Sequence, residues 1–175
     1  MNQVTTIRSA TLEDAPQLSR VHVDAWRETY TSIVPQTYLD GLAYQTRTER
    51  WRRILSEPQP HDGNFVAEVD GQIVGFSGGG KERQYDPEFS GELYALYLLK
   101  THQGKGLGRR LFNAVVEHLV SHGYSNMMLW VLRDNPAVRF YEHLGGVRVR
   151  EQELELAGEK LPEWGYGWRD LGAVR

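Results

Sequence analysis

The chain has 175 residues and no cysteine, and its 20 Lys and Arg against 23 Asp and Glu give a formal net charge of −3. This length suits one domain, residues 1–175, with a proper core, and the lack of cysteine excludes disulfides, thiolate zinc sites and a cysteine nucleophile. The weak negative charge gives no reason to expect nucleic acid or an anionic membrane as the main partner. With no signal-like N-terminus and no run of about 18 apolar residues, we expect a soluble, cytoplasmic protein.

The first third of the chain is predicted to be mainly helical, after a candidate short strand over residues 4–8. Apolar residues recur at intervals of three to five from Leu18 to Tyr30, which is typical of a helix. Asp14 is favoured over Thr11 as the cap of this helix, because Pro16 then lies in the first turn, where its missing N–H costs nothing. Two more helices are predicted over 35–41 and 45–57.

The pattern then changes to strands. Residues 64–69 and 72–77 flank Asp70-Gly71, which predicts a hairpin with a tight turn. A third clear strand over 92–99 leads into a glycine-rich turn and a helix that ends at Gly123. The remaining predicted elements are a strand over 126–132, a helix over 135–144 and strands over 147–156 and 163–171. This order indicates one α/β domain with a mixed sheet covered by helices.

The strongest local motif is Gln103-Gly104-Lys105-Gly106-Leu107-Gly108, between a strand and a helix. Alternating glycines let the backbone approach an anion closely. The free N–H groups and the dipole at the start of the helix favour a phosphate or pyrophosphate. The motif therefore predicts an anion-binding turn, to which Arg109 and Arg110 either add charge or stand as ordinary surface residues.

Other ligand-binding patterns fit less well. A dinucleotide-binding fingerprint has a different glycine spacing and follows the first strand of its unit, whereas these glycines follow the third clear strand. Gly75 to Lys81 resembles a phosphate-binding loop, but Glu82 stands where a hydroxyl should meet magnesium, so a flexible strand end is favoured over a nucleotide hydrolase. His118 and His122 share a helix face, but the glutamate precedes His118, so the residue order of a metalloprotease motif is absent. No metal site is predicted.

At this point the residues resemble the GCN5-related N-acetyltransferase (GNAT) family. Gln103 to Gly108 matches its acetyl-CoA motif of Gln or Arg, two residues, Gly, one residue, and Gly or Ala. A second element of the family follows in Asn135, Ala137, Phe140-Tyr141 and Leu144-Gly145, after the strand that ends at Leu132. The resemblance implies a mixed, mostly antiparallel sheet of about seven strands, flanked by helices and splayed between the fourth and fifth strands.

The resemblance also implies acetyl-CoA as the donor and no metal. Its pyrophosphate would lie on the glycine turn, and its pantetheine arm would pair with the strand at Leu96 to Leu98. Asn135 is interpreted first as a helix cap and second as a cofactor contact. The implied cofactor-binding residues are Leu96, Tyr97, Leu98, Gln103, Gly104, Lys105, Gly106, Leu107, Gly108, Arg109 and Asn135.

Two residues match the family's catalytic positions. Glu92 matches the base that removes a proton from the acceptor amine, with a surface or capping carboxylate as the alternative. Tyr141 matches the acid that protonates the leaving thiolate, with an aromatic core residue as the alternative. A free thiol and a free tyrosine differ by roughly 1.5 pKa units, or about 2 kcal/mol, which permits useful proton transfer.

The predicted function is an N-acetyltransferase that moves an acetyl group to a primary amine by direct transfer in a ternary complex, which fits the lack of cysteine. The alternative is a non-catalytic acetyl-CoA-binding sensor or interaction module. We expect a small-molecule or peptide amine as acceptor, and a homodimer stays open. Asp24, Glu28 and Asp86 could attract a cationic acceptor, although solvated surface is the commoner role of such residues. Most of the aromatic residues are expected to pack in the core. Those that could instead wall the acceptor pocket are Trp26, Tyr30, Tyr85, Trp130, Trp164, Tyr166 and Trp168.

Overall fold

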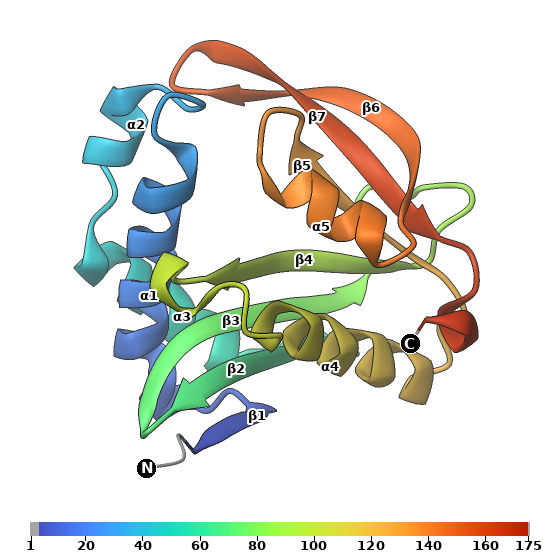
Figure 1. Ribbon diagram of the computed structural model, residues 1–175, viewed down its shortest axis with the longest axis horizontal. Helices are drawn as coiled ribbons and strands as arrows, with labels where there is room; N and C mark the ends of the chain where they lie inside the picture. Colours follow the sequence, from blue (N-terminus) through green and yellow to red (C-terminus); the bar gives the residue numbers. More distant parts are fainter. Residues whose placement is uncertain (1–3, 175) are drawn as a thin grey trace.

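One seven-stranded sheet organises the chain in the computed structural model, which describes residues 4–174 (Figure 1). The strand order is β1-β2-β3-β4-β5-β7-β6, and every neighbouring pair is antiparallel except β4 and β5. The predicted mixed, mostly antiparallel sheet is therefore confirmed. The strands are β1 (Thr5–Ser9), β2 (Gly63–Val69), β3 (Gln72–Lys81), β4 (Gly91–Leu98), β5 (Met127–Leu132), β6 (Val147–Leu156) and β7 (Glu159–Trp168).

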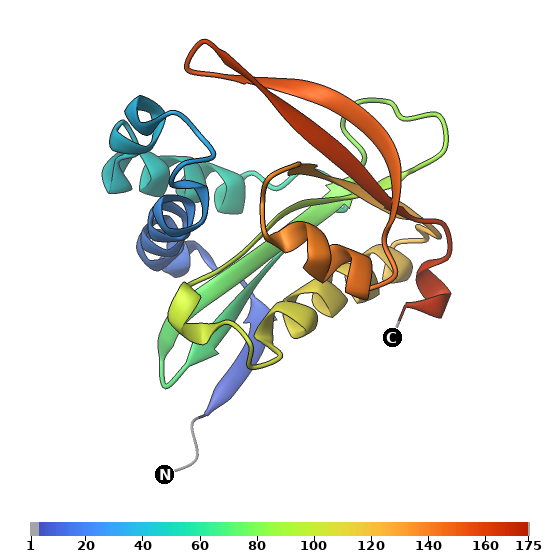
Figure 2. The same ribbon diagram turned by 45° about the horizontal axis from the view of Figure 1, so that its top comes forward.

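Helices cover both faces of the sheet. The two longer helices on one face, α1 (Ala15–Tyr30) and α3 (Tyr44–Ser56), are joined by the short α2 (Gln36–Asp40). The opposite face carries α4 (Leu107–Ser121) and α5 (Ala137–His143), as the turned view in Figure 2 shows. None of the helices within residues 4–174 combines the length and apolar character that a membrane crossing requires.

Each face has its own core. On the first face, α1 and α3 pack on β2 and β3, and the buried side chains there are Ala15, Leu18, Val21, Trp51, Val66, Ile73 and Phe76. On the second face, α4 and α5 pack on the sheet through Leu93, Phe112, Val115, Leu119, Leu129, Val138, Tyr141, Tyr166 and Trp168. Burial of each large apolar side chain contributes roughly 1.5–3 kcal/mol to the free energy of folding.

The sheet opens between its fourth and fifth strands, as predicted. β4 and β5 pair only at Gly91 with Met127 and at Glu92 with Met128. From there β4 continues to Leu98 alongside β3, whereas β5 continues to Leu132 alongside β7. Figure 1 shows the two halves of the sheet moving apart beyond the paired residues.

Three local predictions need correction. Gly75 to Lys81 is not a flexible strand end: these residues lie in β3, an inner strand of the sheet, and Gly75 to Gly80 are buried. The last strand, predicted over 163–171, runs from Glu159 to Trp168. It begins earlier than predicted because Ala157 and Gly158, both with positive φ, form a two-residue turn directly after β6.

The third correction concerns Asp14. It occupies the N-cap position of α1, and Pro16 lies in the first turn, yet its side chain makes no cap hydrogen bond to α1. The carboxylate instead accepts from the backbone N–H of Thr11 at 2.8 Å and from Nη1 of Arg8 at 2.7 Å. Asp14 therefore ties the start of α1 to β1.

Candidate functional site

The free edge of β4 is the first element of the site. Leu99 donates its N–H to the carbonyl of Val74 at 2.9 Å, so its polar backbone groups face β3. Because successive residues of a strand direct these groups to opposite sides, those of Leu98 and Leu96 face the opening between β4 and β5. The carbonyl of Leu98 accepts from Nε2 of Gln103 at 3.0 Å, in agreement with this direction.

The glycine turn lies at the end of this edge. Gly104 and Gly106 have φ of +73° and +81°, a left-handed conformation that strains any residue with a Cβ, and no other atom lies within 4 Å of either missing Cβ. The helical ladder of α4 begins with the bond from Arg110 N to Gly106 O. The N–H groups of Leu107 and Gly108 precede this bond and point out of the open helix end.

The remaining predicted residues of the turn have different surroundings. The side chain of Leu107 is buried in the core, so only its backbone can face a ligand. A Cβ on Gly108 would meet Phe140 of α5 at 3.3 Å, so this glycine allows α4 and α5 to approach each other closely. Lys105 and Arg109 are exposed beside the turn.

Tyr141 lies on α5 and is only 6% exposed. Its ring packs against Trp168 and belongs to the core of the second face. Burial, with a smaller contribution from Tyr30, raises the pKa of Tyr141 above that of a free tyrosine. The hydroxyl therefore keeps its proton throughout the neutral range, and its mismatch with a free thiol exceeds the value expected for an unperturbed side chain.

A chain of hydrogen bonds crosses the open end of the sheet. Asn135, just after β5, donates from Nδ2 to the hydroxyl of Tyr30 at 3.1 Å, and Oδ1 of Asn135 accepts from the N–H of Ala137, which supports its role as a cap. The hydroxyls of Tyr30 and Tyr97 lie 3.3 Å apart. Tyr97 belongs to β4, so α1 connects the two separated strands at this point.

Glu92 lies on β4 at the point where pairing with β5 ends, and it is 2% exposed. Oε1 of its carboxylate accepts from Nη2 of Arg83 at 2.5 Å, and Oε2 accepts from Nε and from the backbone N–H of the same residue, both at 3.1 Å. Three charge-assisted or backbone hydrogen bonds therefore fix the carboxylate in place.

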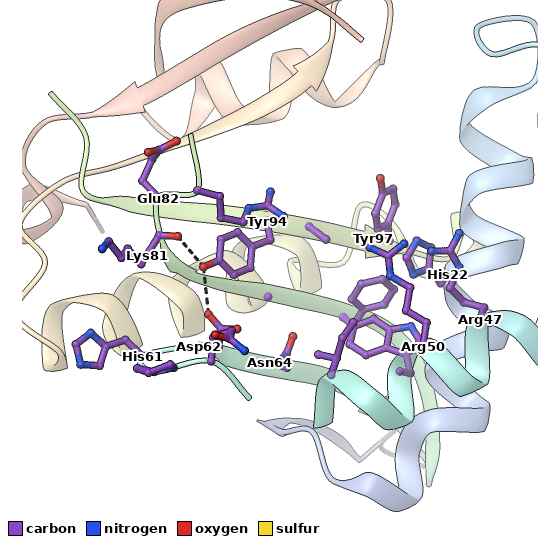
Figure 3. A pocket seen from close by; sticks show the side chains of 18 of the residues that line it. His22, Arg47, Arg50, His61, Asp62, Asn64, Lys81, Glu82, Tyr94 and Tyr97 are labelled. Carbon is purple, nitrogen blue, oxygen red and sulfur yellow. Dashed lines mark hydrogen bonds between the residues drawn. The ribbon is translucent and has the colours of Figure 1, made fainter. Parts of the chain in front are cut away.

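A cavity of about 990 Å³ opens on the first face of the sheet, between α1, α3 and strands β2 to β4. Figure 3 shows His22, Arg47, Arg50 and Tyr97 at one end of it. The other end is lined by His61, Asp62, Lys81 and Glu82, with Tyr94 between the two groups. Tyr97 thus lines the cavity and also borders the opening between β4 and β5.

His22 lies among the aromatic rings of this cavity. Its ring stacks on Tyr97, with centroids 5.5 Å apart, and also packs near Trp51 and Phe76. Burial, followed by the positive charges of Arg47 and Arg50, lowers the pKa of His22 to about 3. The imidazole is therefore neutral at physiological pH.

The structure brings most of the predicted site residues together and separates several others. The β4 edge, the glycine turn, Asn135 and Tyr141 all border the opening of the sheet. Of the aromatic residues expected to wall an acceptor pocket, only Trp26 lines the cavity. Tyr30, Tyr166 and Trp168 are buried in the core, Trp164 stacks under Arg148, and Tyr85 is 90% exposed.

The acidic residues considered as an attraction for a cationic acceptor, with solvated surface as the favoured alternative, have partners within the protein. Asp24 accepts from the hydroxyl of Tyr44, Glu28 accepts from the N–H of Lys100, and Asp86 pairs with Arg150. Sequence reasoning missed Arg47, Arg50, Trp51 and Tyr94. A signal existed for the arginines, since positions 47, 50, 51 and 54 share one face of a helix.

His118 and His122 lie at the C-terminal end of α4. Within residues 4–174 no three His, Asp or Glu side chains gather closely enough to hold an ion. His118 and His122 stack with centroids 4.2 Å apart, and Nε2 of His118 lies 2.9 Å from the carbonyl of His61. These histidines therefore pack a helix end.

Comparison with known proteins gives three results. The family model described as "Acetyltransferase (GNAT) family" matches residues 23–146. The N-acetyltransferase YuaI of Bacillus subtilis is 41% identical over 174 residues, which cover 98% of this chain and 97% of that protein. The fold is similar to PaiA N-acetyltransferase of Thermoplasma acidophilum in complex with coenzyme A (TM-score 0.67, 19% identity, 92% and 98% of the two chains). It is also similar to YncA of Salmonella typhimurium with its cofactor acetyl-CoA (TM-score 0.71, 21% identity, 96% and 94%).

Proposed function

The chain belongs to the acetyltransferase (GNAT) family as an acyl-CoA-dependent N-acetyltransferase, and we propose that it transfers an acetyl group from acetyl-CoA directly to a primary amine. The observation that carries this proposal is the opening between β4 and β5, with the glycine turn at its end and Tyr141 at its side. Acetyl-CoA supplies an activated thioester, and Glu92 and Tyr141 are the proposed proton acceptor and proton donor of the chain.

The residues fit such a donor. The open space beside Gly104 and Gly106, next to the N–H groups at the start of α4, suits a pyrophosphate. The backbone groups of Leu96 and Leu98 lack a strand partner on the side of the opening, which suits the amides of a pantetheine arm. The N–H of Leu98 is the proposed donor to the thioester oxygen as negative charge develops on it.

In the proposed reaction the acceptor amine enters through the cavity beside Tyr97. An ammonium group has no lone pair, so it must first lose a proton, and we propose Glu92 as the base, acting through water. The amine nitrogen then forms a bond to the acetyl carbon while the carbon–sulfur bond breaks. Tyr141 donates its proton to the departing sulfur, and the second proton of the nitrogen is released to solvent.

The first experiment is thermal unfolding with acetyl-CoA, CoA, ATP and NAD. A ligand at about 100 times its dissociation constant adds roughly 2.7 kcal/mol, which shifts the midpoint by several degrees in a domain of this size. A shift with acetyl-CoA and CoA alone supports the donor site. No shift with either ligand at millimolar concentration would contradict it.

The second experiment separates catalysis from the alternative of an acetyl-CoA sensor. Thiol release from acetyl-CoA is followed with a panel of amines, in the wild type and in Tyr141→Phe. Amine-dependent release that falls in the variant supports the enzyme. Ligand binding without amine-dependent release, unchanged in Tyr141→Phe, would favour the sensor.

A further inference from the structure

One end of the cavity carries positive charge that the protein does not balance. Arg47 and Arg50 lie three residues apart on α3, so their side chains share a helix face, and both line the cavity. Within residues 4–174 no carboxylate oxygen comes within 4.0 Å of either guanidinium. Figure 3 shows the two side chains next to His22.

The electrostatics of this end follow from the same arrangement. Arg47 is half-buried, and burial and then the charge of Arg50 lower the pKa of Arg47. His22, between these arginines and Tyr97, is neutral and adds no compensating charge. Arg50 is exposed, so the free-energy cost of the neighbouring like charges falls mainly on the half-buried Arg47, and a bound anion would offset it.

The opposite end of the cavity does not offer a matching cation site. The carboxylate of Glu82 accepts from the N–H groups of Gln84 and Asp86 at 2.7 and 2.8 Å, and it is 7% exposed. Asp62 accepts from the hydroxyl of Tyr94 at 3.1 Å. Because these carboxylates already accept hydrogen bonds from the protein, the cavity favours an anionic ligand group beside Arg47 and Arg50 over a cationic ligand group beside Glu82 and Asp62.

Apolar surface adjoins the arginines. Trp26, Trp51, Ile54 and Phe76 line the same end. Tyr97 lines this end and also borders the opening of the sheet, so a ligand bound beside the arginines can direct its amine toward the opening. A compact molecule fits this arrangement.

We propose that the acceptor is a small primary amine that carries an anionic group and an apolar body, and that Arg47 and Arg50 bind the anionic group. An amino acid with a free carboxylate has this chemistry, as does an amine with a phosphate. This inference rests on the proposed function, because it names the substrate class of the same site.

Binding is measured first, since it does not depend on turnover. N-acetylphenylalanine and N-acetylphenylalanine amide, which differ only in the charge of one group, are titrated calorimetrically with and without CoA. Charged hydrogen bonds of this kind predict a preference for the carboxylate of about ten- to a hundredfold. Arg47→Gln and Arg50→Gln should each remove most of it, whereas Arg52→Gln, exposed on the same helix outside the cavity, should leave it intact.

Turnover then identifies the source of the anionic group. Phenylalanine, phenylalanine amide and phosphoethanolamine are compared as acceptors, and the two arginine variants should raise KM for the preferred anionic amine more than they lower kcat. Equal binding of the carboxylate and the amide, failure of every anionic probe to bind at millimolar concentration, or a preference unchanged in both arginine variants would overturn the proposal. A failed donor site would appear separately, as the absence of CoA binding in the same titrations.

Discussion

Arg83 binds both carboxylate oxygens of Glu92, with Nη2 2.5 Å from Oε1 and Nε 3.1 Å from Oε2. Arg83 lines the cavity, whereas Glu92 is almost fully buried behind it. The Arg83 guanidinium therefore lies beside the proposed base and also reaches the cavity. The proposed role of Glu92 as the base can therefore be tested by substituting either residue of this pair.

Glu92→Gln should lower kcat/KM near neutral pH by about 10²-fold or more, because a general base contributes this much. The loss should shrink as the pH rises, since the acceptor then deprotonates without help. The measurement is kcat/KM against pH for the wild type, Glu92→Gln and Arg83→Gln, the last of which keeps the carboxylate. If Glu92→Gln lowers only the unfolding midpoint and leaves the pH profile unchanged, Glu92 is a structural partner of Arg83.

Tyr141→Phe should lower kcat by about 10²-fold while it preserves CoA binding, because it removes one proton donor and keeps the ring in the core. Since burial raises the pKa of Tyr141, no loss of activity from its ionisation is expected below about pH 10. Tyr166→Phe is the matched control, because it deletes a hydroxyl bonded to Glu142 in the same core. Equal losses in both variants would contradict the role of an acid.

Gly106→Ala should weaken CoA binding at least about tenfold, because the proposed anion-binding turn needs the left-handed φ of +81° at this residue and the open space beside it. Gly123→Ala is a close control, because that glycine has φ of +85° at the other end of α4 and equally open surroundings. Both variants should lose about 1–2 kcal/mol of stability from backbone strain. Calorimetric titration with CoA separates them, and equal affinities would show that the turn does not hold the donor.

Much of the fold was predictable because its signals are local. The Asp70-Gly71 turn fixed the β2–β3 hairpin, and the glycine turn before Leu107 marked the junction of β4 and α4. The opening of the sheet came only from the family resemblance, because pairing of β4 with β5 depends on contacts across the sheet. The position of Asp14 as the N-cap of α1 was predicted correctly, but the partner of its side chain was not, because Arg8 lies on a strand.

The acceptor cavity was the least predictable part of the site. Composition drew attention to tryptophans and acidic residues, yet which of these face the cavity depends on how α1 and α3 cross β3 and β4. Glu28 and Asp86 were considered as an attraction for a cation, with solvated surface favoured, and each is bound by a distant part of the chain. Arg47 and Arg50 stand in a helix that reads as an ordinary charged surface, and only packing of Trp51 against Phe76 turns that face inward.

Asp14→Asn should destabilise the protein by about 1–3 kcal/mol at pH 7, because Arg8 loses a charged partner to which it donates at 2.7 and 2.9 Å. The hydrogen bond from Arg8 is the largest cause that lowers the pKa of Asp14 in the folded state. A lowered pKa stabilises the fold above the unfolded value of roughly 4, and this contribution disappears as the pH falls through the folded value. The difference between wild type and variant in urea unfolding should therefore be largest at neutral pH and narrow below about pH 5. Asp134→Asn is the control, because its pair with Arg133 is exposed and should contribute little. A difference that stays constant down to pH 3 would mean that Asp14 acts through packing and not through its charge.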